Sequence, residues 1–445
     1  MLLGLQFTAD QIITMAPDAS SASAGKKLAS AKNWKSLGQS SEALWGECQG
    51  SALYQVKVDL ASLAIQCSCP SRKQPCKHGI GLLLLAVNLP DLVHVTEHPE
   101  WVTSWLAKRA SVNKRKETRE KSDTTTPSAS QIKTAEKRLA LVKAGIDQLD
   151  LWLNDLIRNG LGLLETQPSK FWEAQAAKMV DAQAPGIALR VRNLATLPNS
   201  SPDWPEKLLW QLGQLALLTQ AFHNIDQLDP GLQEDVRQLV GWNLKEEEVI
   251  ERGERVSDEW LTLGQSFEER ERGQVQHTWL FGISSKRPAH IIQFAFVGTP
   301  FSEHYLPGSM QRADLVYWPS LQPERALIAA RKGDALPIQA ALPGYASIAA
   351  FFDVVATMLA RLPWRESFLC VLNDVIPIYD TSRNQWCVRD QSGQTLPLAR
   401  GEYWQLLAHS GGQAIDFAAE WNGTALLPLG FLAEQQYHPL KLHRI

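Results

Sequence analysis

The chain has 445 residues, of which 44% are hydrophobic and 20% charged, and its formal net charge is −3. This length predicts roughly two to four domains. The small negative charge excludes a dedicated non-specific DNA binder, which carries a strong positive excess, but it allows a local basic patch. No apolar run reaches the length of about 18 residues that a membrane-spanning helix needs.

The most informative pattern is C-x-C-x6-C-x-H, which brings three cysteines and one histidine close together in the sequence. Alternate residues of a strand face the same way, so Cys67 and Cys69 project together from a strand end. Cys76 and His78 come where an apolar run predicts the start of a buried helix. Three thiolates and one imidazole complete a tetrahedral zinc site. The predicted ligands of one structural Zn2+ are therefore Cys67, Cys69, Cys76 and His78.

Other interpretations of these residues are disulfides, plain buried thiols and a catalytic zinc. The first residues lack the basic start and long apolar region of a secretory signal, so we expect a cytoplasmic protein, in which disulfides are disfavoured. Four protein ligands leave no open position for a catalytic water. Beside the ligands, Arg72, Lys73 and Lys77 serve either to contact phosphate or to balance the negative charge of the thiolates.

The ligand spacing, the strands before it and the Pro75-Cys76-Lys77-His78 start of an apolar helix resemble the SWIM-type zinc finger. The flanking residues 44–51 and 79–85 are similar to those of bacterial SWIM zinc finger proteins of comparable length. The resemblance implies a finger that binds DNA or proteins and has no enzymatic activity of its own. It also implies a protein partner, because the bacterial family is often encoded near MoxR-type AAA ATPases and von Willebrand A-domain proteins.

Composition divides the chain into four parts and predicts a multidomain α+β protein. Residues 1–107 hold the finger, at about 43–90, as a small ββα-type module that zinc holds together. Residues 108–130 are basic and polar and predict a disordered linker. Residues 131–242 have apolar side chains at helical spacing and predict a helical bundle. Residues 243–445 predict a β-rich α+β domain, built as one unit or as two small β units flanking a helix.

Several single residues attract attention outside the finger. Trp172, Trp204 and Trp210 are predicted to lie in the core of the bundle, because aromatic residues at helical spacing bury a large area. His94 and His98 have the i, i+4 spacing of some metal sites, but the finger's ligand set is already complete. They are interpreted as surface residues.

Three functions of different classes follow. The first is a non-enzymatic interaction or adaptor protein with a structural zinc. The second is a DNA- or RNA-binding protein that uses the finger and the basic linker. The third is an enzyme with a pocket in the C-terminal domain, although no nucleotide-binding, hydrolase or metalloprotease motif occurs. Neither the identity of the partner nor the oligomeric state follows from the sequence.

Overall fold

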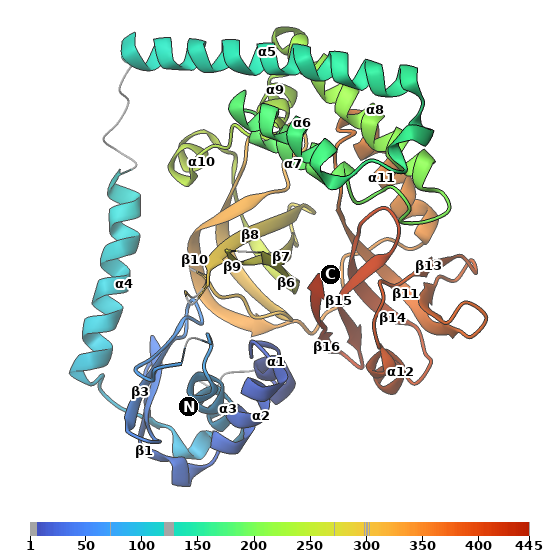
Figure 1. Cartoon of the computed structure of the whole chain (residues 1–445). Helices are drawn as coiled ribbons and strands as arrows, with labels where there is room; N and C mark the ends of the chain where they lie inside the picture. Colours follow the sequence, from blue (N-terminus) through green and yellow to red (C-terminus); the bar gives the residue numbers. More distant parts are fainter. Residues whose placement is uncertain are drawn as a thin grey trace.

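The computed structural model describes residues 7–444, apart from residues 72, 120–128, 271, 298, 300 and 302. Within these residues the fold is mixed α+β and contains three sheets. Figure 1 shows the N-terminal module below, helix α5 across the top with the bundle beneath it, and two β-rich units in the centre and at the right. This arrangement confirms the predicted fold class.

The N-terminal module is a five-stranded sheet in the order β4-β3-β2-β1-β5 with three helices packed on it. Alternation of side chains along β3 places Val56 and Val58 in the core, as the sequence predicts. Its elements are α1 (Ala9–Thr14), α2 (Ala19–Leu28), β1 (Trp34–Gln39), β2 (Ala43–Gln49), β3 (Leu53–Asp59), β4 (Ile65–Cys67), α3 (Lys77–Asn88) and β5 (His94–Val95). Helix α3 is buried along most of its length, because α2 covers one side of it and the sheet another.

Two long helices follow this module: α4 (Glu100–Arg119), and then α5 (Ala129–Asn159), which is the first helix of the bundle. The sequence predicts a disordered linker over residues 108–130, but residues 108–119 continue α4. Lysine, arginine and glutamate have high helix propensity, so a polar composition alone does not prevent a helix there. Residues 129 and 130 of the predicted linker begin α5, and residues 120–128 lie outside the described residues.

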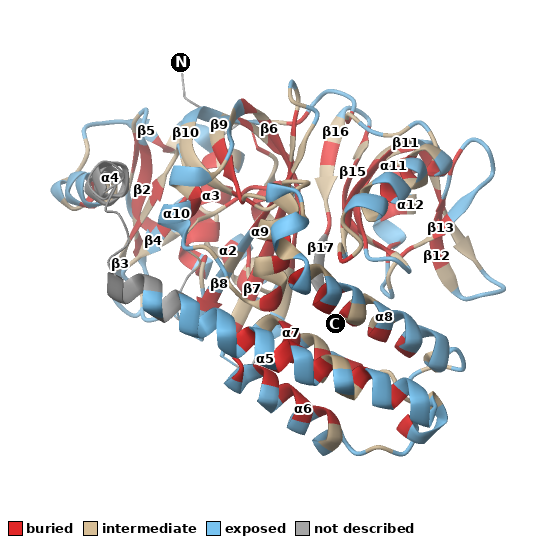
Figure 2. Ribbon diagram, turned by 90° about the horizontal axis from the view of Figure 1, so that it is seen from above, coloured by how far each residue is buried: buried red, intermediate tan, exposed pale blue. Residues whose placement is uncertain are grey.

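The bundle consists of α5, α6 (Ser169–Asp181), α7 (Pro185–Leu194), α8 (Trp204–His223) and α9 (Pro230–Val240). Proline occupies the first turn of α7, α8 and α9, where its missing N–H costs nothing. Trp172 lies in the core and Trp204 is half-buried against it, but Trp210 is 57% exposed, so its predicted core position is wrong. Figure 2 shows that α5 buries one side and exposes the other.

A five-stranded barrel follows the bundle and the short helix α10 (Glu246–Arg252). Its strands are β6 (Arg255–Arg270), β7 (Gly273–Gly282), β8 (Pro288–Phe296), β9 (Ser309–Tyr317) and β10 (Ala326–Pro337). They pair in the order β10-β9-β6-β7-β8, and a parallel bridge from His290 to Arg325 joins the two ends. This is the strand order of the five-stranded Greek-key barrel known as the OB-fold.

The last unit contains α11 (Ile348–Arg361), α12 (Trp404–Ser410) and a six-stranded sheet. The strands of this sheet are β11 (Phe368–Asp380), β12 (Gln385–Arg389), β13 (Thr395–Pro397), β14 (Ile415–Trp421), β15 (Leu426–Ala433) and β16 (Gln436–Pro439). It packs against the barrel, where the indole N–H of Trp279 donates to Glu420 at 2.7 Å. The final strand, β17 (Lys441–Arg444), returns to pair with β6. No helix of the described chain is both long and apolar enough to cross a bilayer.

Candidate metal centre

The four predicted ligands come from one strand end and one helix start in the N-terminal module. Cys67 is the last residue of β4, which pairs with β3 through Cys67 and Val56. Cys69 follows two residues later, and Cys76 is the N-cap of α3. His78 lies in the first turn of α3 and is buried. A strand and a helix that are both fixed by the module's core therefore hold the four side chains from opposite sides.

The ligand atoms of Cys67, Cys69, Cys76 and His78 all lie within 4.8 Å of one another. The Nδ1 atom of His78 is 3.7 Å from the sulfur of Cys67 and 3.8 Å from that of Cys76. Zinc binds sulfur at about 2.3 Å and nitrogen at about 2.0 Å, so tetrahedral ligand atoms lie roughly 3.5–3.8 Å apart. The donor set and its spacing fit one structural Zn2+ with four protein ligands.

The protonation of the cysteines also suits a metal. The pKa of the Cys76 thiol is lowered, above all because the Cys67 thiol donates a hydrogen bond to its sulfur. The same contact raises the pKa of Cys67, and burial raises the pKa of Cys69. One thiolate is thus stabilised in advance, and zinc binding at the other two cysteines releases protons.

Aromatic and glycine contacts fix the orientation of the helix start. The ring of Tyr54, on β3, lies 4.9 Å from the ring of His78 between centroids. Gly79 leaves room for the side chain of Ile65, because a Cβ there would lie 2.5 Å from its Cγ2 atom. Cys48 is buried in the same core but is not part of the ligand group. The core of the finger thus positions the ligands, and Cys48, the fourth cysteine of the module, serves packing.

The basic residues between and beside the ligands have different surroundings. Lys73 forms an ion pair with Asp18 at 2.7 Å, and Asp18 is also the N-cap of α2. Lys77 is exposed, and Arg72 lies outside the described residues. The ammonium of Lys73 already has a carboxylate partner in Asp18, so this contact supports neither phosphate binding nor balancing of the thiolates.

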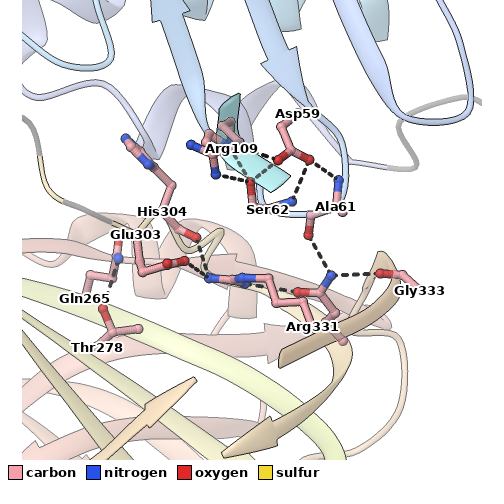
Figure 3. A network of polar contacts seen from close by, with 12 residues as sticks. Asp59, Ala61, Ser62, Arg109, Gln265, Thr278, Glu303, His304, Arg331 and Gly333 are labelled. Atoms are coloured by element: carbon pink, nitrogen blue, oxygen red, sulfur yellow. Dashed lines mark hydrogen bonds and ion pairs between the residues drawn. The ribbon is translucent and has the colours of Figure 1, made fainter. Parts of the chain in front are cut away.

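The finger is attached to the barrel by a polar network, shown in Figure 3. In the finger's loop after β3, the carbonyl of Ala61 accepts a hydrogen bond from the side-chain amide of Gln311 on β9, at 2.8 Å. Arg331 on β10 donates to Gln311 and to Glu303. On the finger side, Asp59 accepts a hydrogen bond from Arg109 of α4 at 3.2 Å. Three segments far apart in sequence therefore meet beside the metal module.

Apolar and cavity-lining residues extend this attachment. Leu306, from the loop between β8 and β9, is part of the finger's own core. Gln11 of α1 donates to the carbonyl of Gly308 at 3.2 Å. A small cavity of about 80 Å3 separates the ligand loop residues Gln74 and Pro75 from the barrel. The zinc loop thus faces β6 and β7 of the barrel across this cavity.

Sequence reasoning missed several residues that shape the site. Asp18 precedes a run of small residues and carries a helix-start signal, but nothing in the sequence connects it to Lys73. Arg109 lies in the segment interpreted as a linker, and its contact with Asp59 depends on α4 being helical. His94 and His98 are not part of the metal-ligand group found among the described residues, and His98 instead contacts Ser40.

A closed Cys3His set between a strand end and a helix start defines the class of zinc finger proteins with a structural metal. Residues 54–86 match the family model of the SWIM zinc finger, and residues 137–240 match that of the SWIM-associated four-helix bundle domain. The chain therefore contains a SWIM zinc finger followed by a SWIM-associated four-helix bundle domain. No curated protein and no solved structure matches it.

Proposed function

We propose that this SWIM-type protein is a non-enzymatic adaptor that docks a partner protein on helix α8 of its bundle. The observation that carries the proposal is an apolar strip on the solvent side of α8, formed by Leu209, Trp210, Gly213 and Leu217. These four residues lie within about one quadrant of the helix, because Leu209, Trp210 and Leu217 are each three or four positions from Gly213. An exposed apolar strip of this kind is typical of a protein-interaction surface.

The centre of the strip is open. A Cβ atom on Gly213 would meet no atom within 4 Å, so nothing in the described chain covers this position. A glycine between large apolar neighbours allows the backbone of a partner helix to approach closely, with Trp210 as an anchor at the edge. We infer an amphipathic helix with an apolar face as the element that docks here.

The zinc finger has a structural role in this proposal. Four protein ligands around the metal leave no position for substrate or water, which supports a non-catalytic zinc. The finger packs on the barrel through Leu306 and Gln311, so zinc binding stabilises the platform from which the bundle extends. As the sequence predicts, the proposal assumes reduced thiols and a cytoplasmic protein.

A MoxR-type AAA ATPase and a von Willebrand A-domain protein from the same organism are the first partners to test, because the family resemblance implies them. Binding of the purified proteins to the zinc-loaded chain is measured by biolayer interferometry. We expect at least one to bind, and Trp210→Asp and Leu217→Asp to weaken binding by tenfold or more. Leu151→Asp, at an exposed leucine of α5, is the matched control and should leave binding unchanged.

Two results would contradict this proposal. If neither protein binds, the partner class is wrong. If one binds and the two α8 variants bind it as well as the Leu151→Asp control does, the docking surface is wrong. Size-exclusion chromatography of the same variants shows whether a second copy of the chain occupies α8 instead.

Nucleic-acid binding is the second candidate, supported by a basic surface beside the finger. Lys26 and Lys27 on α2 and Lys77 on α3 are exposed, and no ion pair of theirs occurs within the described residues. The two helices are in contact there, since a Cβ on Gly25 would lie 3.5 Å from the carbonyl oxygen of Lys77. Three unpaired ammonium groups in one region could neutralise backbone phosphates.

This candidate is tested by binding to a labelled DNA duplex and single strand over a salt series. If it is correct, affinity falls steeply with salt. The double variant Lys26→Glu/Lys77→Glu should then show a less steep plot of log binding constant against log salt concentration. The slope should fall in magnitude by roughly 0.9 for each phosphate that the protein no longer neutralises. Lys286→Glu makes the charge change of one of these two substitutions on the barrel and serves as the control for a single substitution. Absence of binding at physiological salt removes this function.

A further inference from the structure

A cavity lies between the barrel and the C-terminal unit, outside the zinc finger module. Its volume is about 500 Å3, within the roughly 300–1,000 Å3 typical of small-molecule sites. The barrel contributes the end of β7, the start of β8 and the loop before β10, and the C-terminal unit contributes α11 and β11. A pocket between two units is a common place for a ligand.

The walls of this cavity are apolar. One face of α11 lines it with Phe351, Val354, Val355 and Met358, which recur at the three- and four-residue steps of a helix. Phe281 from β7 faces them across the cavity. Such walls favour a ligand whose body is a hydrocarbon chain, because they offer a large apolar area.

Two charged side chains interrupt the apolar lining, and they differ in their surroundings. Glu324 is 14% exposed and forms an ion pair with Arg365, which is 7% exposed. Burial raises the pKa of Glu324 to about 7 despite this pair. The carboxyl group therefore adds no uncompensated negative charge to the cavity.

Lys286 is the opposite case. It is exposed at the rim, in the turn between β7 and β8, and no ion pair of its ammonium group occurs in the described part of the chain. Because the Glu324 charge is compensated by Arg365, the cavity and its rim carry one free positive charge. An anionic group at the mouth would complement it.

We propose that this cavity binds an apolar monocarboxylate of the fatty-acid class, with its chain between α11 and β7 and its carboxylate at Lys286. The chain fills the apolar cavity and releases water from the faces of Phe281 and Phe351. The carboxylate stays at the solvent boundary, where its desolvation is small and a lysine can reach it. This site is separate from the α8 surface, and the proposal does not depend on the adaptor function.

The test is isothermal titration calorimetry of the full-length, zinc-loaded protein with decanoate and with decylamine, both below their micelle concentrations. We expect one decanoate to bind per chain, and affinity to rise about fourfold per added methylene from octanoate to decanoate. Decylamine should bind at least tenfold more weakly than decanoate. Equal or tighter binding of the amine would overturn the assignment of Lys286.

Two variants locate the site. Val354→Trp fills the cavity and should lower the affinity for decanoate by tenfold or more, while Ala356→Trp, on the exposed side of the same helix, should not change it. Lys286→Glu lies in an exposed turn and should keep the fold while reversing the preference from decanoate to decylamine. Decanoate binding that is unchanged in both Val354→Trp and Lys286→Glu, or absent at millimolar concentration, overturns the proposal.

Discussion

The side-chain amide of Gln311 donates hydrogen bonds to the carbonyl of Ala61 at 2.8 Å and to that of Gly333 at 2.9 Å. Ala61 belongs to the zinc module and Gly333 to β10, and Gln311 is 250 positions from Ala61 in the sequence. One largely buried amide therefore joins the finger to the barrel. A substitution of Gln311 therefore tests the attachment of the finger to the barrel separately from the finger's binding of zinc.

Replacing Gln311 with leucine should weaken the attachment of the finger without removing zinc. The variant leaves two carbonyls and the Arg331 guanidinium without this partner, which costs about 1–3 kcal/mol in the free energy of unfolding. Hydrogen exchange of residues 59–63 should increase, while zinc content stays at one per chain. Arg312→Ala, at an exposed neighbour on β9, is the control, and equal exchange in both variants would contradict the prediction.

Removal of one zinc ligand should unfold the finger. Cys76→Ser and His78→Ala take away one ligand each, and structural zinc contributes about 10–16 kcal/mol of apparent binding free energy in finger-sized units. We expect loss of zinc by elemental analysis and rapid proteolysis within residues 43–90, while the bundle remains folded by hydrogen exchange. Cys48→Ala, at the buried cysteine outside the ligand group, should retain zinc, and an unchanged metal content in both ligand variants would refute the assignment.

The bundle contains two glycines whose replacement by alanine should act in opposite directions. A Cβ on Gly186 would lie 2.2 Å from the carbonyl oxygen of Leu239, so Gly186→Ala forces α7 away from α9. We expect a loss of about 1–3 kcal/mol in the free energy of unfolding, measured by urea denaturation. Gly213→Ala meets no atom within 4 Å on exposed α8 and should gain about 0.5–1 kcal/mol. Equal effects would show that α7 and α9 are less closely packed than described.

Glu324 should make stability depend on pH. Burial raises its pKa to about 7 in the folded chain, from about 4.3 for an ordinary glutamate. The folded state therefore binds the proton more tightly, and this group's contribution is fully present below pH 4 and is lost as pH rises from about 4.3 to 7. The whole loss is roughly 4 kcal/mol.

The measurement for Glu324 is urea denaturation of the wild type and of Glu324→Gln at pH 5 and pH 8. The stability difference between the two proteins should move in favour of the glutamine variant by roughly 3 kcal/mol as pH rises. Comparing the proteins at each pH removes the effect of zinc release in acid, which both share. A difference that does not change with pH would contradict the raised pKa.

The sequence by itself determined the zinc site and the types of the main elements. Cys67 and Cys69 are two positions apart on a strand end, and Cys76 and His78 are two positions apart at a helix start. Local backbone geometry fixes the directions of such close neighbours, so a short pattern is enough to identify them. The periodic apolar spacing of the bundle is local information of the same kind.

Only the tertiary structure decided which faces meet. Trp210 has the spacing of a core residue, yet it is exposed because other faces of α8 pack against the bundle. The contact of Gln311 with Ala61, the closure of the barrel at His290, and the cavity beside Lys286 all join residues far apart in the chain. Such contacts depend on how apolar surfaces combine over the whole fold, and no short segment of sequence contains that information.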